Sequence, residues 1–232
     1  MSRRVGILGG MGPQATVLLM SKIIAAVPAM DDRDHVPLLV DQNPQVPSRI
    51  ARLIEGTGED PARELVVMAR RLEGAGAEAL AMPCNTAHHF APAIAAAVAV
   101  PFLDMVALSV AHARRRAGPD GRIGVIASPA LRRIGLFDGR LAQAGLTAVY
   151  PDDEAALLDA IRRIKAGGVD AGSRDAFRRA SAQLLAAGVA TQMIACTEFS
   201  LLADSAEEGA KAFDTLDVLV GAIVDFSLAR DA

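Results

Sequence analysis

The chain has 232 residues, of which 52% are hydrophobic and 22% are charged, with a net charge of −3 at pH 7. This predicts a globular protein with an aliphatic core, either one large or two small domains. The mild acidity gives no argument for nucleic-acid binding, because the longest basic run is Arg114-Arg115-Arg116. The apolar run after Arg4 is too short for a secretory signal or a membrane span. We therefore expect a cytoplasmic protein that contacts neither nucleic acid nor membrane.

Short apolar runs alternate with helical patterns along the whole chain. Apolar runs that end in turn residues predict strands at 4–8, 36–40, 79–82, 100–103, 122–127, 147–150 and 192–195. Helix-start residues and apolar spacing predict helices at 13–26, from 61 past 72, and at 88–98, 130–144, 153–166, 174–187 and 215–228. This alternation predicts an α/β fold with parallel sheets flanked by helices.

The pattern restarts about halfway along the chain, where Gly124 in the fifth predicted strand matches Gly6 in the first. We therefore predict two similar lobes. The first comprises residues 1–104 and a returning terminal segment at 207–232, and the second comprises residues 105–206. Ligands of open parallel sheets bind beyond the carboxyl ends of the strands. A cleft between the two lobes is thus the expected ligand site.

The chain has two cysteines, and each follows a predicted strand. Cys84 lies in Met82-Pro83-Cys84-Asn85-Thr86-Ala87-His88, and Cys196 lies in Ala195-Cys196-Thr197-Glu198. An offset of 112 residues aligns them and also pairs Leu72 with Leu184. A single cysteine is commonly a small buried hydrophobe, but a matched pair favours chemistry. Helix N-terminal amides after each strand would lower the thiol pKa, whereas a disulfide or a four-ligand metal site is disfavoured.

The turn after the first strand reads Gly10-Met11-Gly12-Pro13-Gln14-Ala15, which fits the loose pattern G-x-G-x-x-A. Such a turn can hold a pyrophosphate or a carboxylate on a helix N-terminus, or can simply need glycine for its dihedral angles. No acidic residue follows at the spacing that a dinucleotide site requires, since Asp41 comes too late.

Several charged residues have both a functional and a structural interpretation. Arg49 can grip a carboxylate through two hydrogen bonds, although an isolated arginine is commonly a surface residue. Lys165 ends a predicted helix, where a cation is favourable in any case. Glu198 could hold a substrate ammonium or cap a helix start. His88 or His89 could orient Cys84, although packed or solvated histidines are commoner.

Four segments of the chain together resemble the aspartate/glutamate racemase family, in its cofactor-independent amino-acid racemase branch. They are Gly6-Ile7-Leu8-Gly9-Gly10-Met11-Gly12-Pro13-Gln14-Ala15-Thr16, Pro83-Cys84-Asn85-Thr86-Ala87-His88, Ile164-Lys165-Ala166-Gly167 and Cys196-Thr197-Glu198. The resemblance spans nearly the whole chain. It implies two pseudo-symmetric α/β lobes with the active site between them, no pyridoxal phosphate or other cofactor, no metal, and a homodimer.

The resemblance also implies a mechanism and a set of substrate contacts. One cysteine, as thiolate, removes the α-proton, and the other, as thiol, delivers a proton to the opposite face. The substrate would be an amino acid or a related carboxylate. Arg49 and Lys165 would contact its carboxylate. The other substrate-binding residues would be Met11, Gln14, Asn85, Thr86, Ser128, Thr197 and Glu198.

One segment departs from the family pattern. Family members tend to have a Thr-x-Gly-Thr-like turn followed by a serine and a tyrosine. This chain has Ser128-Pro129-Ala130-Leu131, then Ile134 and Phe137. Near Arg49, Ser48 stands where an acid is common and Ile50 where threonine is common. We therefore expect a substrate less polar than aspartate, or another carboxylate with an acidic α-proton.

Other functions fit the same residues. Within the fold, a hydantoin racemase, a maleate isomerase or a malonate-type decarboxylase would also use one or both thiols. The decarboxylases need only one thiol, so the retained pair favours proton transfer on both faces. From other classes, the glycine turn could serve a nucleotide-binding oxidoreductase, or the cleft could belong to a non-catalytic binding protein.

Overall fold

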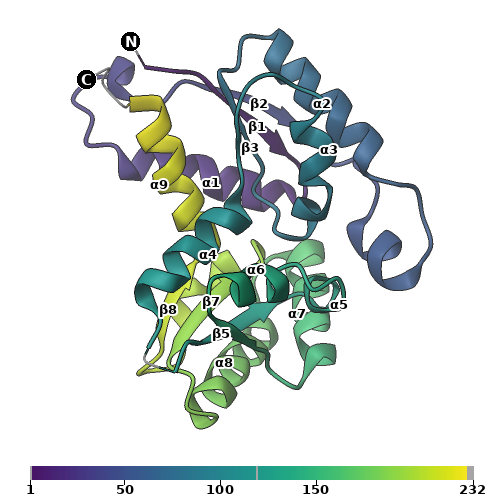
Figure 1. The fold of residues 1–232 in the computed structure, drawn as a ribbon, viewed down its shortest axis with the longest axis vertical. Helices are drawn as coiled ribbons and strands as arrows, with labels where there is room; N and C mark the ends of the chain where they lie inside the picture. The colour runs from purple at the N-terminus through teal and green to yellow at the C-terminus, as the bar shows by residue number, and fades with distance from the viewer. Residues whose placement is uncertain (1, 119, 229–232) are drawn as a thin grey trace. The chain divides into compact units, whose positions relative to one another are not determined.

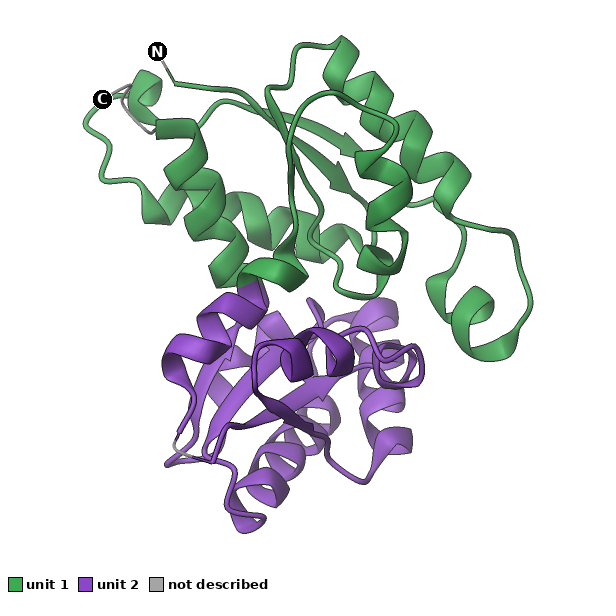
Figure 2. Ribbon diagram, in the orientation of Figure 1, with its two compact units in different colours: residues 1–108, 216–232 green, residues 109–215 purple. Residues whose placement is uncertain are grey.

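The computed structural model describes residues 2–118 and 120–228 and divides into two compact units. Unit 1 contains residues 1–108 and 216–232, and unit 2 contains residues 109–215 (Figure 2). Each unit is built on a four-stranded parallel sheet flanked by helices (Figure 1). The predicted α/β fold with two parallel-sheet lobes is therefore confirmed.

The sheet of unit 1 has the strand order β2-β1-β3-β4. Its strands are β1 (Val5–Gly9), β2 (Leu38–Gln42), β3 (Ala79–Ala81) and β4 (Phe102–Leu103). Its helical segments are α1 (Pro13–Ala26), η1 (Asp32–Asp34), η2 (Ala51–Glu55), α2 (Ala62–Gly74), η3 (Thr86–Phe90) and α3 (Ala91–Ala95). Two more helices, α4 (Met105–Arg116) and α9 (Thr215–Leu228), each include residues of both units.

The sheet of unit 2 repeats this topology, with the order β6-β5-β7-β8. Its strands are β5 (Arg122–Ala127), β6 (Thr147–Val149), β7 (Thr191–Ala195) and β8 (Lys211–Asp214). Its helical segments are α5 (Pro129–Arg133), α6 (Asp138–Gln143), α7 (Glu154–Gly167), α8 (Ala171–Ala186) and η4 (Phe199–Ser205). In both sheets the first strand of the unit is central and pairs with the second and third.

A glycine in each central strand lets a helix pack closely on the sheet. A Cβ atom on Gly6 would lie 3.1 Å from the Cβ of Leu72 in α2 and 2.8 Å from the Cδ2 of Leu80. A Cβ atom on Gly124 would lie 2.8 Å from the Cδ1 of Leu184 in α8. The paired glycines and paired leucines of the sequence therefore occupy equivalent positions in the two units.

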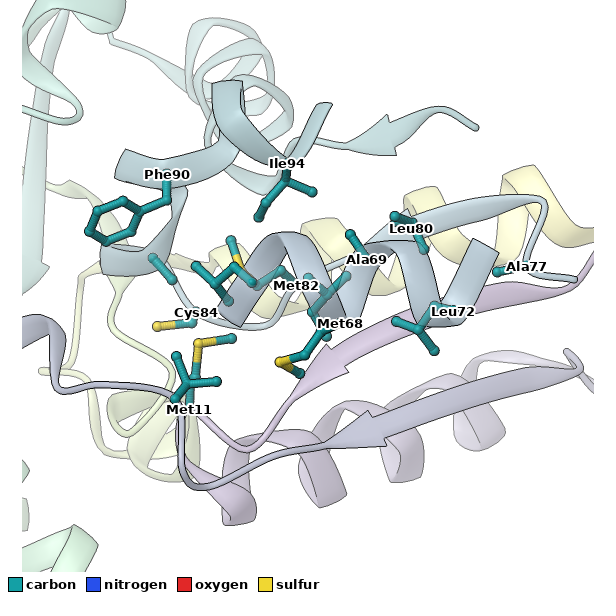
Figure 3. Packing of buried hydrophobic residues seen from close by; sticks show 14 residues of the cluster. Met11, Met68, Ala69, Leu72, Ala77, Leu80, Met82, Cys84, Phe90 and Ile94 are labelled. Carbon is teal, nitrogen blue, oxygen red and sulfur yellow. The ribbon is translucent and has the colours of Figure 1, made fainter. Parts of the chain in front are cut away.

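Alternate residues of β1 supply two hydrophobic clusters in unit 1. Val5 and Ile7 pack with α1 and α9, where Leu19, Ile23 and Leu219 are buried. Leu8 packs into the opposite cluster, whose other members come mainly from α2, β3, η3 and α3 (Figure 3). Successive side chains of a strand point to opposite faces, so helices cover both faces of this sheet.

The predicted helix at 130–144 is wrong, because it is broken into α5 and α6. Gly135 adopts a left-handed conformation with φ of 60° between them, and glycine takes such values without steric cost. The predicted helix at 88–98 is also shorter, because residues 86–90 form a 3₁₀ turn and α3 ends at Ala95.

The terminal segment divides differently from the expected 207–232. The short strand β8 pairs with β7 from Thr191 opposite Lys211 to Ile194 opposite Asp214. This pairing places residues up to 215 in unit 2, so only 216–232 return to unit 1. At the other boundary, unit 1 extends to Leu108, within α4, rather than to the expected residue 104. Among the helices in the described residues, none has the length and apolar character needed to cross a membrane.

Gly6→Ala should lower the free energy of unfolding by about 1–3 kcal/mol, because the added methyl group has no space between α2 and β3. Gly221→Ala is the matched control in unit 1, because Gly221 is an exposed helix residue and its added Cβ meets nothing within 4 Å. We expect it to raise stability by about 0.5–1 kcal/mol. Urea unfolding followed by circular dichroism measures both, and equal effects would contradict the close-packing argument.

Candidate active site

Each unit places one cysteine beyond the carboxyl end of the strand next to its central strand. Cys84 follows β3, which ends at Ala81, and Cys196 directly follows β7, which ends at Ala195. Both are free thiols, with 7% and 6% of their surface exposed. A short 3₁₀ segment, η3 or η4, begins soon after each cysteine. The two thiols therefore occupy equivalent, nearly buried positions in the two units.

Cys84 belongs to the hydrophobic cluster on the α2 face of unit 1. Met11, which follows β1, and Val46, which follows β2, are buried in the same cluster. Figure 3 shows Cys84 and Met11 at the same end of this cluster, away from Leu72 and Ala77. Three neighbouring strand ends thus supply the surroundings of this thiol, as the carboxyl edge of a parallel sheet should.

Asn85 and Thr86 continue the chain directly from Cys84 into η3. Asn85 is 2% exposed and Thr86 is partly buried. On the loop after β2, one terminal nitrogen of Arg49 (Nη1) donates to the carbonyls of Val46 at 3.2 Å and Pro47 at 3.0 Å. Its Nε is buried and has no hydrogen-bond partner among the described residues. Arg49 therefore holds the loop that contains it through these two hydrogen bonds. Its guanidinium has further N–H groups that can still donate.

The glycine turn after β1 is held together internally. The amide of Gly10 donates to the hydroxyl of Thr16 at 2.9 Å, and this hydroxyl donates to the carbonyl of Gly12 at 3.4 Å. Gly10 has φ of 91°, and a Cβ atom there would lie 2.4 Å from the backbone of Asn43. The Gly10 amide is therefore engaged within the turn. Gln14 is exposed on the first turn of α1.

In unit 2, Cys196 has an acidic partner and Glu198 a basic one. The Cys196 thiol donates to the Oε2 of Glu198 at 3.1 Å. The Oε1 of Glu198 pairs with the ammonium of Lys165 at 3.0 Å. Glu198 is 8% exposed, whereas Lys165 reaches it from the last turn of α7 with a more exposed side chain. These residues form a thiol–carboxylate–ammonium chain, and Lys165 is already paired with a carboxylate of the protein.

The pKa of Cys196 is raised well above its usual value. Burial is the largest cause, followed by the negative charge of Glu198 and the hydrogen bond to it, while Lys165 and a backbone hydrogen bond act in the opposite direction. The expected lowering by helix amides is therefore wrong for Cys196, because burial and a neighbouring carboxylate outweigh it. The raised pKa favours the protonated form of this thiol.

The segment that departs from the family pattern lies largely in the interior of unit 2. Ala130, Leu131 and Phe137 have no exposed surface. These apolar residues therefore fill the core and carry little information about a substrate pocket. Ser128 precedes α5 and is 5% exposed, and Ile134 is partly buried.

The predicted site residues gather at two sheet edges, one in each unit. Unit 1 holds Met11, Gln14, Arg49, Cys84, Asn85 and Thr86, and unit 2 holds Ser128, Lys165, Cys196, Thr197 and Glu198. The link from Lys165 to Glu198 was missed in the sequence because the two lie in different elements. Within residues 2–118 and 120–228, no group of three or more His, Cys, Asp or Glu side chains is placed to hold a metal ion.

Two repeated parallel sheets, each with a thiol at the same strand end, are the architecture expected from the family resemblance. A family model described as Asp/Glu/Hydantoin racemase matches residues 8–223. The chain belongs to this family.

Individual relatives agree with this membership. The chain is 32% identical to the broad-specificity amino-acid racemase RacX of Bacillus subtilis over 106 residues, which are 44% of this chain and 45% of that protein. The match thus spans less than half of the curated relative. An aspartate racemase from Picrophilus torridus has a TM-score of 0.87 at 24% identity, covering 97% of this chain and 94% of that one.

An aspartate racemase homologue from Pyrococcus horikoshii has a TM-score of 0.77 at 21% identity, covering 98% of this chain and 99% of that one. A glutamate racemase from Francisella tularensis in complex with D-glutamate has a TM-score of 0.67 at 15% identity, covering 97% and 80%. Because the sequence identities to these solved structures are low, the structural similarity establishes the two-lobed fold alone.

Glu198→Gln should lower the pKa of Cys196, because it removes a negative charge that disfavours the thiolate. Alkylation requires the thiolate, so the pH profile of iodoacetamide modification at Cys196 should shift to lower pH. Peptide mass spectrometry measures this site separately from Cys84. Glu208→Gln, at an exposed position of the same unit, should leave the profile unchanged. An unshifted profile in Glu198→Gln would contradict the assigned electrostatic control.

Proposed function

We propose that the protein is a cofactor-independent amino-acid racemase that interconverts L and D enantiomers through Cys84 and Cys196. The observation that carries this proposal is the equivalent placement of one nearly buried thiol at the same strand end of each unit. Membership of the Asp/Glu/hydantoin racemase family supports it. Racemisation needs an acid and a base on opposite faces of one carbon, and two equivalent thiols can exchange those roles.

The proposed reaction moves one proton at each face of the α-carbon. In one direction Cys84 acts as thiolate and takes the α-proton, leaving a carbanion-like state. Cys196 then gives its thiol proton to the opposite face and becomes the thiolate. The product state has Cys84 protonated and Cys196 ionised, which is the starting state for the other enantiomer. Backbone amides near Asn85 and Thr197 are candidate donors to the substrate carboxylate as its charge increases.

Glu198 and Lys165 set the ionisation of Cys196 in this scheme. Without substrate, burial and, after it, the carboxylate of Glu198 raise the pKa of Cys196 and keep the thiol protonated. A substrate ammonium near Glu198 would offset the carboxylate's charge and lower the pKa of Cys196. The positive charge of Lys165 already acts to lower the pKa of Cys196. We therefore propose that Lys165 acts on Cys196 through Glu198, in addition to the substrate-carboxylate contact expected from the family resemblance.

We propose an amino-acid substrate whose side chain need not carry a carboxylate. The name of the Bacillus subtilis relative, a broad-specificity amino-acid racemase, supports this breadth. By comparison with the family pattern, this chain has Ile50 in place of a threonine, Ser48 in place of an acid and Ile134 in place of a serine. By the family resemblance we further propose a cytoplasmic homodimer that uses neither pyridoxal phosphate nor a metal.

A hydantoin is the second candidate substrate. The description of the matching family includes hydantoin racemases, and the carbon between the ring nitrogen and carbonyl carries an acidic proton of the same kind. A panel of L- and D-amino acids and 5-substituted hydantoins in heavy water separates the two. Proton NMR then follows loss of the α-proton or ring-proton signal together with inversion. A panel in which no compound exchanges its proton would contradict the racemase proposal.

Cys84→Ser and Cys196→Ser should each lower kcat/KM by at least about 100-fold. A serine hydroxyl is a far weaker acid than a thiol, and because it stays un-ionised near neutral pH it is also a poor base. Chiral chromatography of the product mixture measures the rate. Thermal unfolding of each variant checks that it is folded. Wild-type turnover by a folded double variant would refute the two-cysteine mechanism.

Arg49→Lys should raise KM about tenfold with a smaller change in kcat, because an ammonium cannot reproduce the two-pronged grip of a guanidinium on a carboxylate. Arg52→Lys, an exposed arginine in η2, should behave as wild type. Steady-state kinetics separate the two constants. A loss of thermal stability with KM unchanged would show instead that Arg49 serves only to close its loop onto the carbonyls of Val46 and Pro47.

A further inference from the structure

His88 is a buried imidazole that the proposed proton transfers do not use. It lies in η3, one helical turn after Cys84, and is 1% exposed. Its Nδ1 lies 2.8 Å from the carbonyl oxygen of Cys84. Its Nε2 accepts a hydrogen bond from the backbone amide of Met105 at 3.1 Å. Both ring nitrogens therefore contact backbone groups, and the two groups belong to different elements.

These two hydrogen bonds define one tautomer of the ring. The Met105 amide can only donate, so Nε2 presents its lone pair. The ring proton is then on Nδ1, which donates to the Cys84 carbonyl, an acceptor. A proton on Nε2 would face another N–H group. His88 is thus a neutral bridge with a donor at the Cys84 end and an acceptor at the Met105 end.

The second end of this bridge is the N-terminus of α4. Met105 is the first residue of that helix. The next two amides, from Val106 and Ala107, donate to the Oδ1 of Asp104 at 2.9 and 3.0 Å. The same carboxyl oxygen lies 4.0 Å from the Nε2 of His88. His88 and Asp104 therefore share the amides that an α-helix leaves without intrahelical partners.

The helix held in this way belongs to both units. Residues up to Leu108 lie in unit 1, and α4 continues without a break from Ser109 into unit 2. A shift of unit 2 that carries α4 with it acts directly on the Met105 amide. Through the imidazole, it acts on the backbone of Cys84. Small displacements of a reacting group are costly, since misplacement by about 1 Å can reduce rates about 100-fold.

We propose that His88 is a positioning residue, which ties the backbone of Cys84 to the first turn of α4 and so couples the placement of this thiol to the helix that joins the two units. Its consequence for catalysis depends on the proposed racemase function, whereas its effect on the thiol itself does not. The imidazole also lies against Phe102 of β4, with ring centroids 5.5 Å apart. Variants must therefore separate loss of a hydrogen bond from loss of packing.

Two conservative substitutions each keep one end of the bridge. In His88→Asn, the side-chain amide can replace Nδ1 and donate to the Cys84 carbonyl, but it is too short to reach the Met105 amide. In His88→Gln, the longer side chain can place its oxygen near Nε2 and accept from Met105, leaving the Cys84 carbonyl without this donor. Comparison of the two tests whether both ends are needed. His89→Asn is the matched control, because His89 is the exposed neighbour.

Alkylation and enzyme kinetics of the 232-residue chain test the proposal. Iodoacetamide modification of Cys84 should change at least about threefold in both His88 variants, since loss of one buried hydrogen bond allows the loop to move, while Cys196 in the same molecule keeps its rate. With a racemisable substrate, kcat should fall about tenfold in both variants and KM should change less. His89→Asn should match wild type in both measurements.

The following outcomes would overturn the proposal. Wild-type alkylation and kcat in His88→Asn would show that the link to α4 is dispensable. Unchanged alkylation of Cys84 in both variants would overturn the positioning role of His88 even if no substrate were found. This result would not bear on the racemase proposal, so the two proposals can fail separately. If the variants do not fold, a long-range ¹H–¹⁵N spectrum of the wild-type protein decides. It should show His88 protonated on Nδ1 and unprotonated on Nε2, and the reverse pattern would refute the bridge.

Discussion

Close packing of one helix on the central strand of each sheet is the constraint on which both thiol positions depend. Gly6 and Gly124 leave room for the leucines of α2 and α8, and the strand that follows each helix in the chain leads to a cysteine. A wider separation would move this third strand and the thiol beyond it. The positions of the two thiols at the sheet edges therefore depend on glycines in the central strands, which have no side chain.

Electrostatics distinguishes two thiols that topology makes equivalent. Cys196 donates to a carboxylate that is itself paired with Lys165, whereas Cys84 lies in an apolar cluster with Met11 and Val46. A two-base reaction needs its acid and base in opposite protonation states at the start of each turnover. In the proposed mechanism, the different surroundings of the two thiols would provide this asymmetry, and the ion pair of Glu198 with Lys165 would let a charged substrate adjust it.

The sequence indicated the sheets and their repetition, because apolar strands and glycine positions are local signals. Most strands were found to within a few residues, and α1 and α9 were found with their bounds. The strand β8 was missed, since Lys211-Ala212-Phe213-Asp214 acquires strand character only by pairing with β7. The pKa of Cys196 was also out of reach, because it depends on burial and on a carboxylate orientation that spacing does not encode. The contacts of Arg49, Lys165 and His88 with distant or backbone atoms are likewise products of tertiary packing.

The arrangement of the units along the chain has a consequence for biosynthesis. Unit 2 is inserted into unit 1, so helix α9 of unit 1 is synthesised after unit 2. Leu216, Leu219 and Ile223 of α9 complete the cluster that covers Val5, Ile7 and Leu19. On the ribosome, that face of the first sheet is covered by α1 but lacks α9 until the second unit has emerged. The unit that is begun first is therefore completed only after the second unit has been made.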